Sequence, residues 1–410
     1  MEKTKIHTCN FCGKEKESVE RLIVSETSAI CNECVDLCIE ILNEDKIKKF
    51  PSAENKIFNP TLIKEFLDGY IVAQDEAKIA LSVAVCQHFK RIFNPTNEIE
   101  IEKTNVLLMG PTGCGKTMLA KKLAEYLDVP FAICDATGIT EAGYVGDDVE
   151  SVLSRLLSAA DYDIKKAEMG IIYIDEIDKL SRKSESTSIT RDVGGEGVQQ
   201  GLLKMVEGSI VRVPAADKRK HPKGDMLEID TNKILFICGG AFVGLDKIID
   251  RRINSTVMGF NAEVKTKKQE LSYANVTTKD LIVFGMIPEF IGRFGMITAV
   301  EELNVEDLIK ILKEPKNSLI KQYSHLFELD GIQLEFDDPA LTAIAEKAKE
   351  MQTNARGLKN IIEKVLLPYQ FDSINLVERG LKKLLISKDA VEGKPAKLIF
   401  EERKEIKNKS

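Results

Sequence analysis

Short runs of apolar residues alternate with longer stretches of helical spacing over the middle of the chain. The run Val106-Leu107-Leu108-Met109 is typical of a strand buried on both faces of a parallel sheet. Similar runs follow at 130–135, 170–176, 233–238 and 295–300. Because strands that alternate with helices form parallel sheets, this pattern predicts an α/β domain with a five-stranded parallel sheet.

Helical spacing surrounds these strands. Asn59-Pro60-Thr61 predicts the start of a helix that ends at Gly69, and Lys116 opens a helix after the first strand. From Asn304 onward helical spacing predominates, interrupted by a short strand at 332–336, which predicts a mainly helical small domain. The remaining helices are expected at 75–89, 147–160, 305–312, 319–327, 339–349 and from 354.

The first strand leads directly into Gly110-Pro111-Thr112-Gly113-Cys114-Gly115-Lys116-Thr117, the pattern G-x-x-x-x-G-K-T between a strand and a helix. Its glycines let backbone N–H groups curl around phosphate oxygens, and the helix N-terminus adds partial positive charge. Lys116 is expected to reach the β- and γ-phosphates, and Thr117 to offer its hydroxyl to Mg²⁺. A chance glycine-rich turn is the alternative, but both flanks favour a site for a nucleoside triphosphate.

The strand at 170–176 ends in Asp175-Glu176. Asp175 is expected to help hold Mg²⁺, directly or through water, and Glu176 to polarise the attacking water. Any strand can end in acidic residues, so the pattern is weak by itself. Its position downstream of the glycine-rich loop makes it specific, and together the two motifs predict hydrolysis of the bound nucleotide.

Two C-x2-C pairs, Cys9 with Cys12 and Cys31 with Cys34, lie near the N-terminus. Paired cysteines at this spacing predict one tetrahedral Zn²⁺ with a closed, structural coordination sphere, whereas a redox thiol pair is the alternative. A module of about 50 residues buries little core, so the metal is expected to supply folding energy. Few basic and several apolar side chains favour a protein-binding or self-associating module over a nucleic-acid-binding one.

Bulk composition limits the function further. With 410 residues, 43% hydrophobic and 30% charged, the chain fits a globular protein of several domains. Its net charge of −7 argues against broad binding to nucleic acid. The sequence shows neither an apolar run near the ~20 residues that span a bilayer nor a secretion signal, so we expect a cytoplasmic location and no membrane partner. Its 4 histidines leave little for a protease site, so any proteolysis is expected from a partner.

Three segments and one arginine carry residues that invite a functional explanation. Gly143-Tyr144-Val145-Gly146 sets an aromatic ring between flexible positions, although a buried turn tyrosine fits equally well. The Ser/Thr-rich stretch 181–197 is typical of a functional loop. Lys218-Arg219-Lys220-His221 indicates an anionic partner, with a solvated loop or a nucleic-acid patch as alternatives. Arg356 stands near a helix N-terminus, where a nucleotide phosphate would explain its charge; a solvated surface arginine is the alternative.

Taken in order, these motifs resemble those of the ClpX family, the AAA+ ATP-dependent unfoldases of the bacterial Clp protease. The resemblance runs from Cys9 to about Leu398 and includes Ile287-Pro288-Glu289-Phe290-Ile291-Gly292-Arg293. It implies a homohexamer with ATP bound between subunits, and a zinc module that dimerises and docks adaptor proteins. We therefore expect a zinc module at 1–48, a linker at 49–58, a large AAA+ domain at 59–303, a small AAA+ domain at 304–400 and a charged tail at 401–410.

The resemblance also implies roles for individual residues. Arg293 matches the arginine finger that reaches a neighbour's γ-phosphate, and Arg356 matches the sensor-2 arginine that couples nucleotide state to the angle between domains. Val72 and Met118 match nucleotide-binding positions. The substrate-contacting set comprises Tyr144 and Val145 in the first pore loop, Arg191 in the second, and Arg219, Lys220 and His221 in the entrance loop, which attracts unstructured substrate tags.

The chain departs from the family pattern in three places. Met258-Gly259-Phe260 stands where the peptidase-docking loop reads Ile-Gly-Phe, and Val72-Ala73-Gln74 where the adenine-side segment reads Ile-Gly-Gln. The fourth strand ends in Cys238 rather than asparagine, so no sensor-1 residue is assigned. The sequence thus predicts an unfoldase that uses ATP, Mg²⁺ and Zn²⁺ and feeds a ClpP-type peptidase. The alternative is an AAA+ remodeller of nucleic-acid or protein complexes that acts without a peptidase.

Overall fold

The computed structural model describes residues 8–25, 27–38, 59–93, 99, 101–140, 147–181, 195–214, 226–256 and 273–400. Contacts divide the chain into two units, Met1–Phe58 and Asn59–Ser410. Among the described helices, none combines the length and the apolar character needed to cross a membrane. Several predicted functional residues lie outside the described residues: Tyr144, Val145, Arg191, Arg219, Lys220, His221, Met258, Gly259 and Phe260.

The first unit contains a short antiparallel hairpin that brings the cysteine pairs together. Strands β1 (Leu22–Val24) and β2 (Ala29–Cys31) pair with Leu22 opposite Cys31, and the 3-10 turn η1 (Lys16–Ser18) precedes them. The buried residues of its core are three of the cysteines themselves, packed against Val19, Leu22 and Ile30. Burial of such a small core contributes little to the stability of the module, so we expect its fold to depend on a group that binds the four sulfurs.

The large domain of the second unit is organised around a five-stranded sheet with strand order β11-β3-β10-β7-β4. Every neighbouring pair in this sheet is parallel. The sequence prediction of a five-stranded parallel sheet is therefore confirmed. The strands are β3 (Val106–Met109), β4 (Phe131–Asp135), β7 (Ile171–Asp175), β10 (Leu235–Gly240) and β11 (Met296–Ala299).

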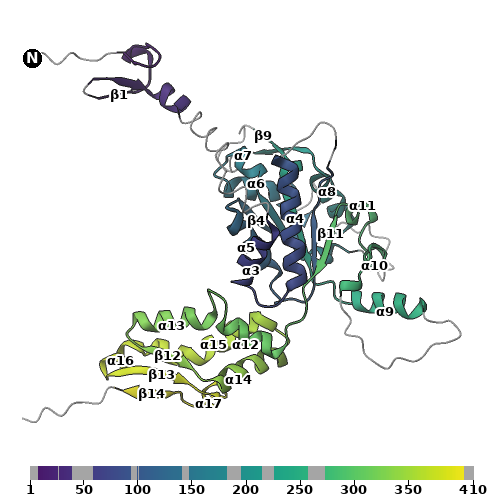
Figure 1. The fold of residues 1–410 in the computed structure, drawn as a ribbon, viewed down its shortest axis with the longest axis vertical. Coiled ribbons are helices and arrows are strands. Elements are labelled where there is room, and N and C mark those ends of the chain that lie inside the picture. Colours follow the sequence, from purple (N-terminus) through teal and green to yellow (C-terminus); the bar gives the residue numbers. More distant parts are fainter. Residues whose placement is uncertain are drawn as a thin grey trace, which may run out of the picture. The chain divides into compact units, whose positions relative to one another are not determined.

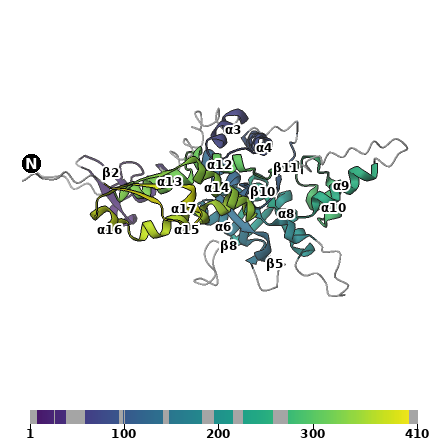
Figure 2. The same cartoon turned by 90° about the horizontal axis from the view of Figure 1, so that it is seen from below.

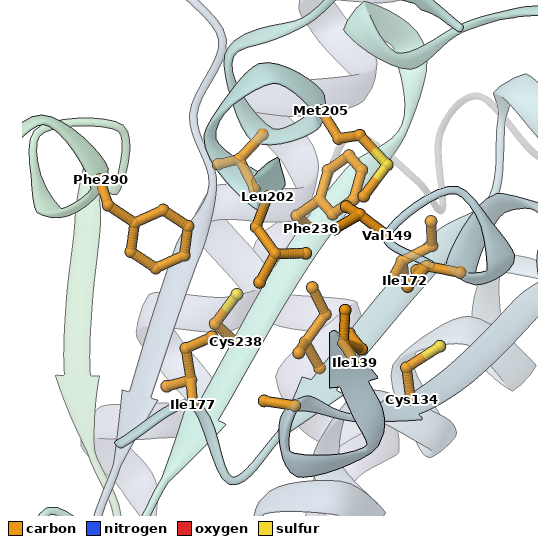
Figure 3. Packing of buried hydrophobic residues seen from close by; sticks show 14 of the residues in the cluster. Cys134, Ile139, Val149, Ile172, Ile177, Leu202, Met205, Phe236, Cys238 and Phe290 are labelled. Atoms are coloured by element: carbon orange, nitrogen blue, oxygen red, sulfur yellow. The ribbon is translucent and has the colours of Figure 1, made fainter. Parts of the chain in front are cut away.

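Helices cover both faces of this sheet (Figures 1 and 2). On one face α3 (Pro60–Asp68) packs on α4 (Asp75–Phe93) and α5 (Lys116–Leu127), α4 contacts β3 and β11, and α5 contacts β7 and β10. On the other face α6 (Ser151–Ala159) and α8 (Glu196–Glu207) share one buried cluster with alternate strand residues. Figure 3 shows Leu202 and Met205 of α8 beside Phe236 of β10 in this cluster.

Shorter elements complete the large domain. They are η2 (Ala136–Gly138), β5 (Ile139–Thr140), β6 (Asp147–Asp148), α7 (Ile164–Glu168), η3 (Ile177–Leu180), β8 (Ile210–Pro214), β9 (Met226–Asp230), η4 (Thr231–Lys233), α9 (Leu245–Thr256), η5 (Tyr273–Asn275), α10 (Thr278–Phe284) and α11 (Pro288–Ile291). Strands β8 and β9 form an antiparallel hairpin that the sequence did not predict, and the basic segment 218–221 lies between them in the chain.

Some predicted boundaries are wrong: the helix expected over 75–89 extends to Phe93, and two other elements begin later than expected. The helix expected over 147–160 begins only at Ser151, because Asp147 and Asp148 pair with Ile139 and Thr140 as strand β6. The strand expected from Lys233 begins at Leu235, because the Asp230 side chain caps the 3-10 turn η4 over Thr231–Lys233. In both places a polar side chain or a distant strand determines the local structure.

The small domain contains six helices among the described residues and a mixed sheet of three strands. Its elements are α12 (Val305–Lys313), α13 (Leu319–Leu329), β12 (Gln333–Phe336), α14 (Asp338–Glu350), α15 (Asn354–Phe371), α16 (Ser373–Glu378), β13 (Leu381–Ile386), α17 (Lys388–Val391) and β14 (Lys397–Phe400). Strand β13 pairs in parallel with β12 and antiparallel with β14. The predicted helices and the strand near 332–336 are present, whereas β13 and β14 were missed.

Helix ends in the second unit carry the side chains that their sequences predict. The Asn59 side chain accepts a hydrogen bond from the N–H of Thr61 at the start of α3, and Gly69 follows its last residue. Asn304 and Asp307 form a capping box on α12, which fixes where the small domain begins to be helical.

Candidate functional sites

The glycine-rich loop follows β3 at the carboxyl edge of the sheet. Gly110, with φ of 130°, donates its N–H to the carbonyl oxygen of Gly240 at 3.1 Å. A Cβ at Gly110 would overlap the Val300 carbonyl oxygen and lie 2.7 Å from Val300 Cγ2. Gly115 has φ of 99° and occupies the N-cap of α5. Glycine is therefore required sterically at Gly110 and conformationally at Gly115, as expected for a loop whose backbone curls around a phosphate.

Lys116 lies inside this loop. Its side-chain Nζ donates to the carbonyl oxygens of Gly110 at 2.6 Å and Pro111 at 2.9 Å, and the residue is 8% exposed. Burial lowers the pKa of Lys116, while the nearby Asp175 carboxylate opposes that shift. A partly desolvated ammonium held by carbonyl oxygens gains strongly from a phosphate, because two anionic oxygens replace neutral acceptors.

Asp175 ends strand β7 next to Thr117. One carboxylate oxygen, Oδ2, accepts the Thr117 hydroxyl at 3.0 Å. The other, Oδ1, accepts the Tyr173 hydroxyl at 3.2 Å and the Glu176 N–H at 2.9 Å. A hydroxyl and a carboxylate this close together supply the oxygen ligands that Mg²⁺ prefers, so the residues fit a magnesium site beside the phosphate loop.

Glu176 follows Asp175 in a left-handed conformation with φ of 55°, at the N-cap of η3. A non-glycine residue in this conformation costs about 1 kcal/mol, so neighbouring contacts must maintain it. One such contact comes from Asp178, which is 5% exposed and accepts the Ala241 N–H at 3.0 Å through Oδ1. The turn thereby exposes the Glu176 side chain at the carboxyl edge of the sheet, near the phosphate loop.

The small domain contacts the glycine-rich loop through the start of α15. Asn354 Nδ2 donates to the Thr112 carbonyl oxygen at 3.1 Å. A Cβ at Gly113, where φ is +82°, would lie 2.7 Å from the Thr353 carbonyl oxygen and 3.7 Å from Arg356 Cβ. The structure therefore places Arg356 beside the loop, and its positive charge contributes to the lowered pKa of Lys116. The sequence analysis missed Asn354 as a contact residue.

Arg293 lies near the amino ends of the strands, whereas the glycine-rich loop lies at their carboxyl ends. It precedes β11, whose first residue pairs with Val106 at the start of β3, whereas the glycine-rich loop follows the end of β3. The Arg293 carbonyl oxygen accepts a hydrogen bond from Asn105 Nδ2 at 2.9 Å, and its guanidinium pairs with Glu207 of α8. At ~3.3 Å per residue, the strand alone separates Arg293 from the phosphate loop of the same chain by roughly 10 Å.

The segment Val72-Ala73-Gln74 precedes α4 in an unusual conformation. Ala73 and Gln74 both have positive φ, 54° and 64°. The Gln74 amide donates to the Glu301 carbonyl oxygen at 2.9 Å and accepts the Glu301 N–H at 2.7 Å. Val72 and Ala73 also line a pocket of about 650 Å³ with residues of α12, and Met118 is 41% exposed at the start of α5. The bonds to Glu301 thus hold the segment beside α12, where the large and small domains meet.

The four N-terminal cysteines form the one group of at least three His, Cys, Asp or Glu residues among the described residues that could hold a metal ion. Their sulfurs lie within 4.8 Å of one another, with 3.9 Å between Cys9 and Cys34 and 3.6 Å between Cys12 and Cys31. Four sulfurs at ~2.3 Å from one tetrahedral ion lie about 3.8 Å apart. The cysteines therefore fit a closed structural zinc site.

The fold and the two sites define a class of protein: an AAA+ P-loop ATPase that carries an N-terminal four-cysteine zinc finger. Three family models match the chain, namely the AAA domain (Cdc48 subfamily) over residues 101–297, the ClpX C4-type zinc finger over 7–44, and the C-terminal, D2-small domain of ClpB protein over 303–380.

The match to a curated relative covers almost the whole chain. The "ATP-dependent Clp protease ATP-binding subunit ClpX" of Treponema denticola is 53% identical over 390 residues, which cover 93% of each chain. The chain therefore belongs to the ClpX family. The resemblance predicted from the motifs is confirmed, as are the fold class, ATP binding and the zinc finger.

Proposed function

We propose that this protein is an ATP-driven protein unfoldase and translocase that recognises tagged substrates, unfolds them through the pore of a homohexamer and delivers them to a ClpP-type peptidase. Membership of the ClpX family supports the link to the Clp protease. The observation that carries the hydrolytic part is the convergence of Lys116, Thr117, Asp175 and Arg356 at one edge of the sheet.

Within this site the residues take different roles. Gly110 to Thr117 hold the phosphates, with Val72 and Met118 on the base side, and Thr117 and Asp175 hold Mg²⁺. Glu176 polarises the attacking water from its exposed position. Arg356 senses the nucleotide from the small domain, because α15 already contacts the loop through Asn354. Mg²⁺ held by Thr117 and Asp175 would supply positive charge beside the phosphates.

Arg293 completes the site of another copy. Its position at the far edge of the sheet, paired with Glu207, separates it from the phosphate loop of its own chain. An arginine that must act on a γ-phosphate is then supplied by the neighbouring subunit, as in other trans-acting arginine fingers. This arrangement supports a ring in which each active site lies between two subunits.

The remaining assignments are proposals that rest on the family pattern. Tyr144, Val145 and Arg191 contact the translocating chain, Arg219, Lys220 and His221 attract the substrate tag, and Met258-Gly259-Phe260 docks the peptidase. The zinc module, 1–48, dimerises and binds adaptors, and a linker at 49–58 joins it to the large domain at 59–303, the small domain at 304–400 and the tail. Cysteine ligands suit a reducing compartment, so we propose that the protein works in the cytoplasm.

The test uses a stably folded fluorescent protein with a short unstructured C-terminal tag. We expect ATP-dependent loss of fluorescence with a ClpP-type peptidase present, and little net loss without it, because the released chain refolds. Brisk ATP turnover with no loss under either condition would contradict the unfoldase function. A peptidase-independent effect would instead favour a remodeller that acts alone.

The in-trans role of Arg293 needs a separate experiment. Lys116→Ala removes phosphate binding from one subunit, and Arg293→Ala removes the finger from another. Each variant alone is expected to be inactive, whereas mixed rings regain sites in which an intact loop faces an intact finger. If mixing restores no ATPase activity while the two variants still co-assemble, the in-trans role is wrong.

A further inference from the structure

Tyr173 lies in the middle of β7, two residues before Asp175, and its side chain is fully buried. Its hydroxyl donates to Asp175 Oδ1 at 3.2 Å. The phenol is thus positioned as a hydrogen-bond donor to this carboxylate oxygen.

The neighbouring strand makes room for this hydroxyl. Strands β7 and β10 are parallel, with Ile237 opposite Tyr173 and Cys238 opposite Ile174, so Gly239 falls beside Asp175. A Cβ on Gly239 would overlap the Tyr173 hydroxyl and lie 2.7 Å from the ring carbon Cζ. Any side chain at Gly239 would displace the phenol, so the glycine is needed for the contact between Tyr173 and Asp175.

The two carboxylate oxygens of Asp175 accept hydrogen bonds from different partners. Oδ1 receives the Tyr173 hydroxyl and the Glu176 N–H, whereas Oδ2 receives the Thr117 hydroxyl. With Oδ1 held on the strand side, the carboxylate plane is fixed and Oδ2 points toward Thr117, the other residue that would hold the metal. Second partners of metal ligands commonly orient them in this way.

We propose that Tyr173 is a positioning residue for magnesium and ATP: it fixes the Asp175 carboxylate, and Gly239 provides the space for it to do so. The inference rests on the proposed role of Asp175 as a magnesium ligand. Without the hydroxyl, Oδ1 keeps one hydrogen bond and the carboxylate can turn away from Thr117. Loss of one hydrogen bond to a charged group corresponds to roughly a tenfold change in an equilibrium.

The test is the substitution Tyr173→Phe, which deletes only the hydroxyl. In a Glu176→Gln background, where ATP binds without turnover, we measure ATP affinity by calorimetry across a series of Mg²⁺ concentrations. We expect the Mg²⁺ concentration at half-maximal binding to rise about tenfold. In the otherwise unmodified protein, we expect the Mg²⁺ concentration at half-maximal ATPase rate to rise by a similar factor, while kcat at saturating Mg²⁺ stays close to the parent value.

The chain offers a matched control. Tyr323 of α13 is also buried, and its hydroxyl donates to Glu363 Oε1 at 2.9 Å in the small domain. Tyr323→Phe removes the same group from a carboxylate outside the phosphate loop and is expected to leave the Mg²⁺ dependence unchanged. A second variant, Gly239→Ala, leaves the phenol intact but displaces it, and should raise the half-saturating Mg²⁺ concentration in the same direction.

The outcomes separate the inference from the proposed function. If Asp175→Asn raises the Mg²⁺ requirement but Tyr173→Phe and Gly239→Ala do not, the positioning role of Tyr173 is wrong. If Asp175→Asn itself leaves the Mg²⁺ requirement unchanged, the proposed magnesium site fails and the inference fails with it. Equal shifts from Tyr323→Phe and Tyr173→Phe would reduce the effect to a general loss of stability and overturn the inference.

Discussion

His88 gives the sharpest prediction about stability. It lies on α4 with 1% exposure, and its ring Nε2 is 3.0 Å from the Lys233 carbonyl oxygen. Burial, with the charges of Arg91 and Lys103, lowers the pKa of His88 from 6.5 to about 3. The folded protein therefore keeps this ring neutral, with Nε2 as the donor, at pH values where the unfolded chain takes up a proton.

The sign of the effect follows from proton linkage. Between pH 3 and pH 6.5 the unfolded state binds more protons at His88 than the folded state, so the free energy of unfolding falls as the pH falls. Each pH unit below 6.5 costs about 1.4 kcal/mol, so the loss at pH 5 is about 2 kcal/mol. For a domain stable by ~5–15 kcal/mol, this loss is large.

The substitution His88→Gln tests this value, because glutamine keeps an N–H donor for the Lys233 carbonyl oxygen but does not titrate. Urea unfolding is followed by circular dichroism from pH 8 to pH 5, and labelling of the buried Cys238 identifies the transition of the large domain. We expect the variant to lose ~2 kcal/mol less than the parent over this range. His325→Gln, at a side chain that is 70% exposed, is the control. Parallel pH profiles for parent and His88→Gln would refute the reasoning.

Three further predictions concern separate parts of the chain. Cys12→Ser should release zinc and unfold the module around it, because its core is small, while ATPase activity persists; metal analysis that finds one zinc per chain would contradict this. Ala73→Gly should raise the free energy of unfolding by about 0.5–1 kcal/mol and so move the urea midpoint upward, since Ala73 has φ of 54°. An unchanged or lower midpoint would mean that the conformation is not strained. Glu176→Gln should bind ATP with near-normal affinity yet lower kcat at least 100-fold; normal turnover would remove Glu176 from its role.

Much of the fold could be predicted because its signals are local. Val106 to Met109 and Ile171 to Ile174 are fully buried strands, and a continuous apolar run identifies such strands without knowledge of their partners. The zinc site was predictable for the same reason, since each C-x2-C pair occupies one turn of chain. The helix caps at Asn59 and Asn304 likewise involve residues within one turn.

The missed features depend on contacts between distant residues. Strand β13 pairs in parallel with β12 from beyond three helices, and its sequence, Leu381-Lys382-Lys383-Leu384-Leu385-Ile386, does not alternate. Asn354 contacts Thr112 from another domain, which no local pattern encodes. The role of Tyr173 was missed for another reason. Within the apolar run Ile171 to Ile174 its side chain reads as one more buried residue, and only the pairing of β7 with β10 shows that Gly239 leaves room for its hydroxyl to bond to Asp175.

Helix α4 connects the two edges of the sheet. It has 19 residues and so spans about 28 Å. Before its first turn, Gln74 is bonded to the backbone of Glu301 at the carboxyl edge, where the nucleotide site lies. Near its last turn, His88 and Arg91 bind the carbonyl oxygens of Lys233 and Asn232 at the opposite edge.

The turn η4, which α4 contacts through His88 and Arg91, directly follows strand β9 of the β8–β9 hairpin. Lys103 Nζ binds the Thr231 carbonyl oxygen at 2.8 Å, so three successive carbonyl oxygens, those of Thr231, Asn232 and Lys233, each bond to a basic side chain. Thr231 directly follows β9, and the chain between β8 and β9 contains the basic segment 218–221. The segment Val72-Ala73-Gln74 and the turn after β9 are therefore held at opposite ends of the same helix, the first by bonds to Glu301 and the second by bonds from His88 and Arg91.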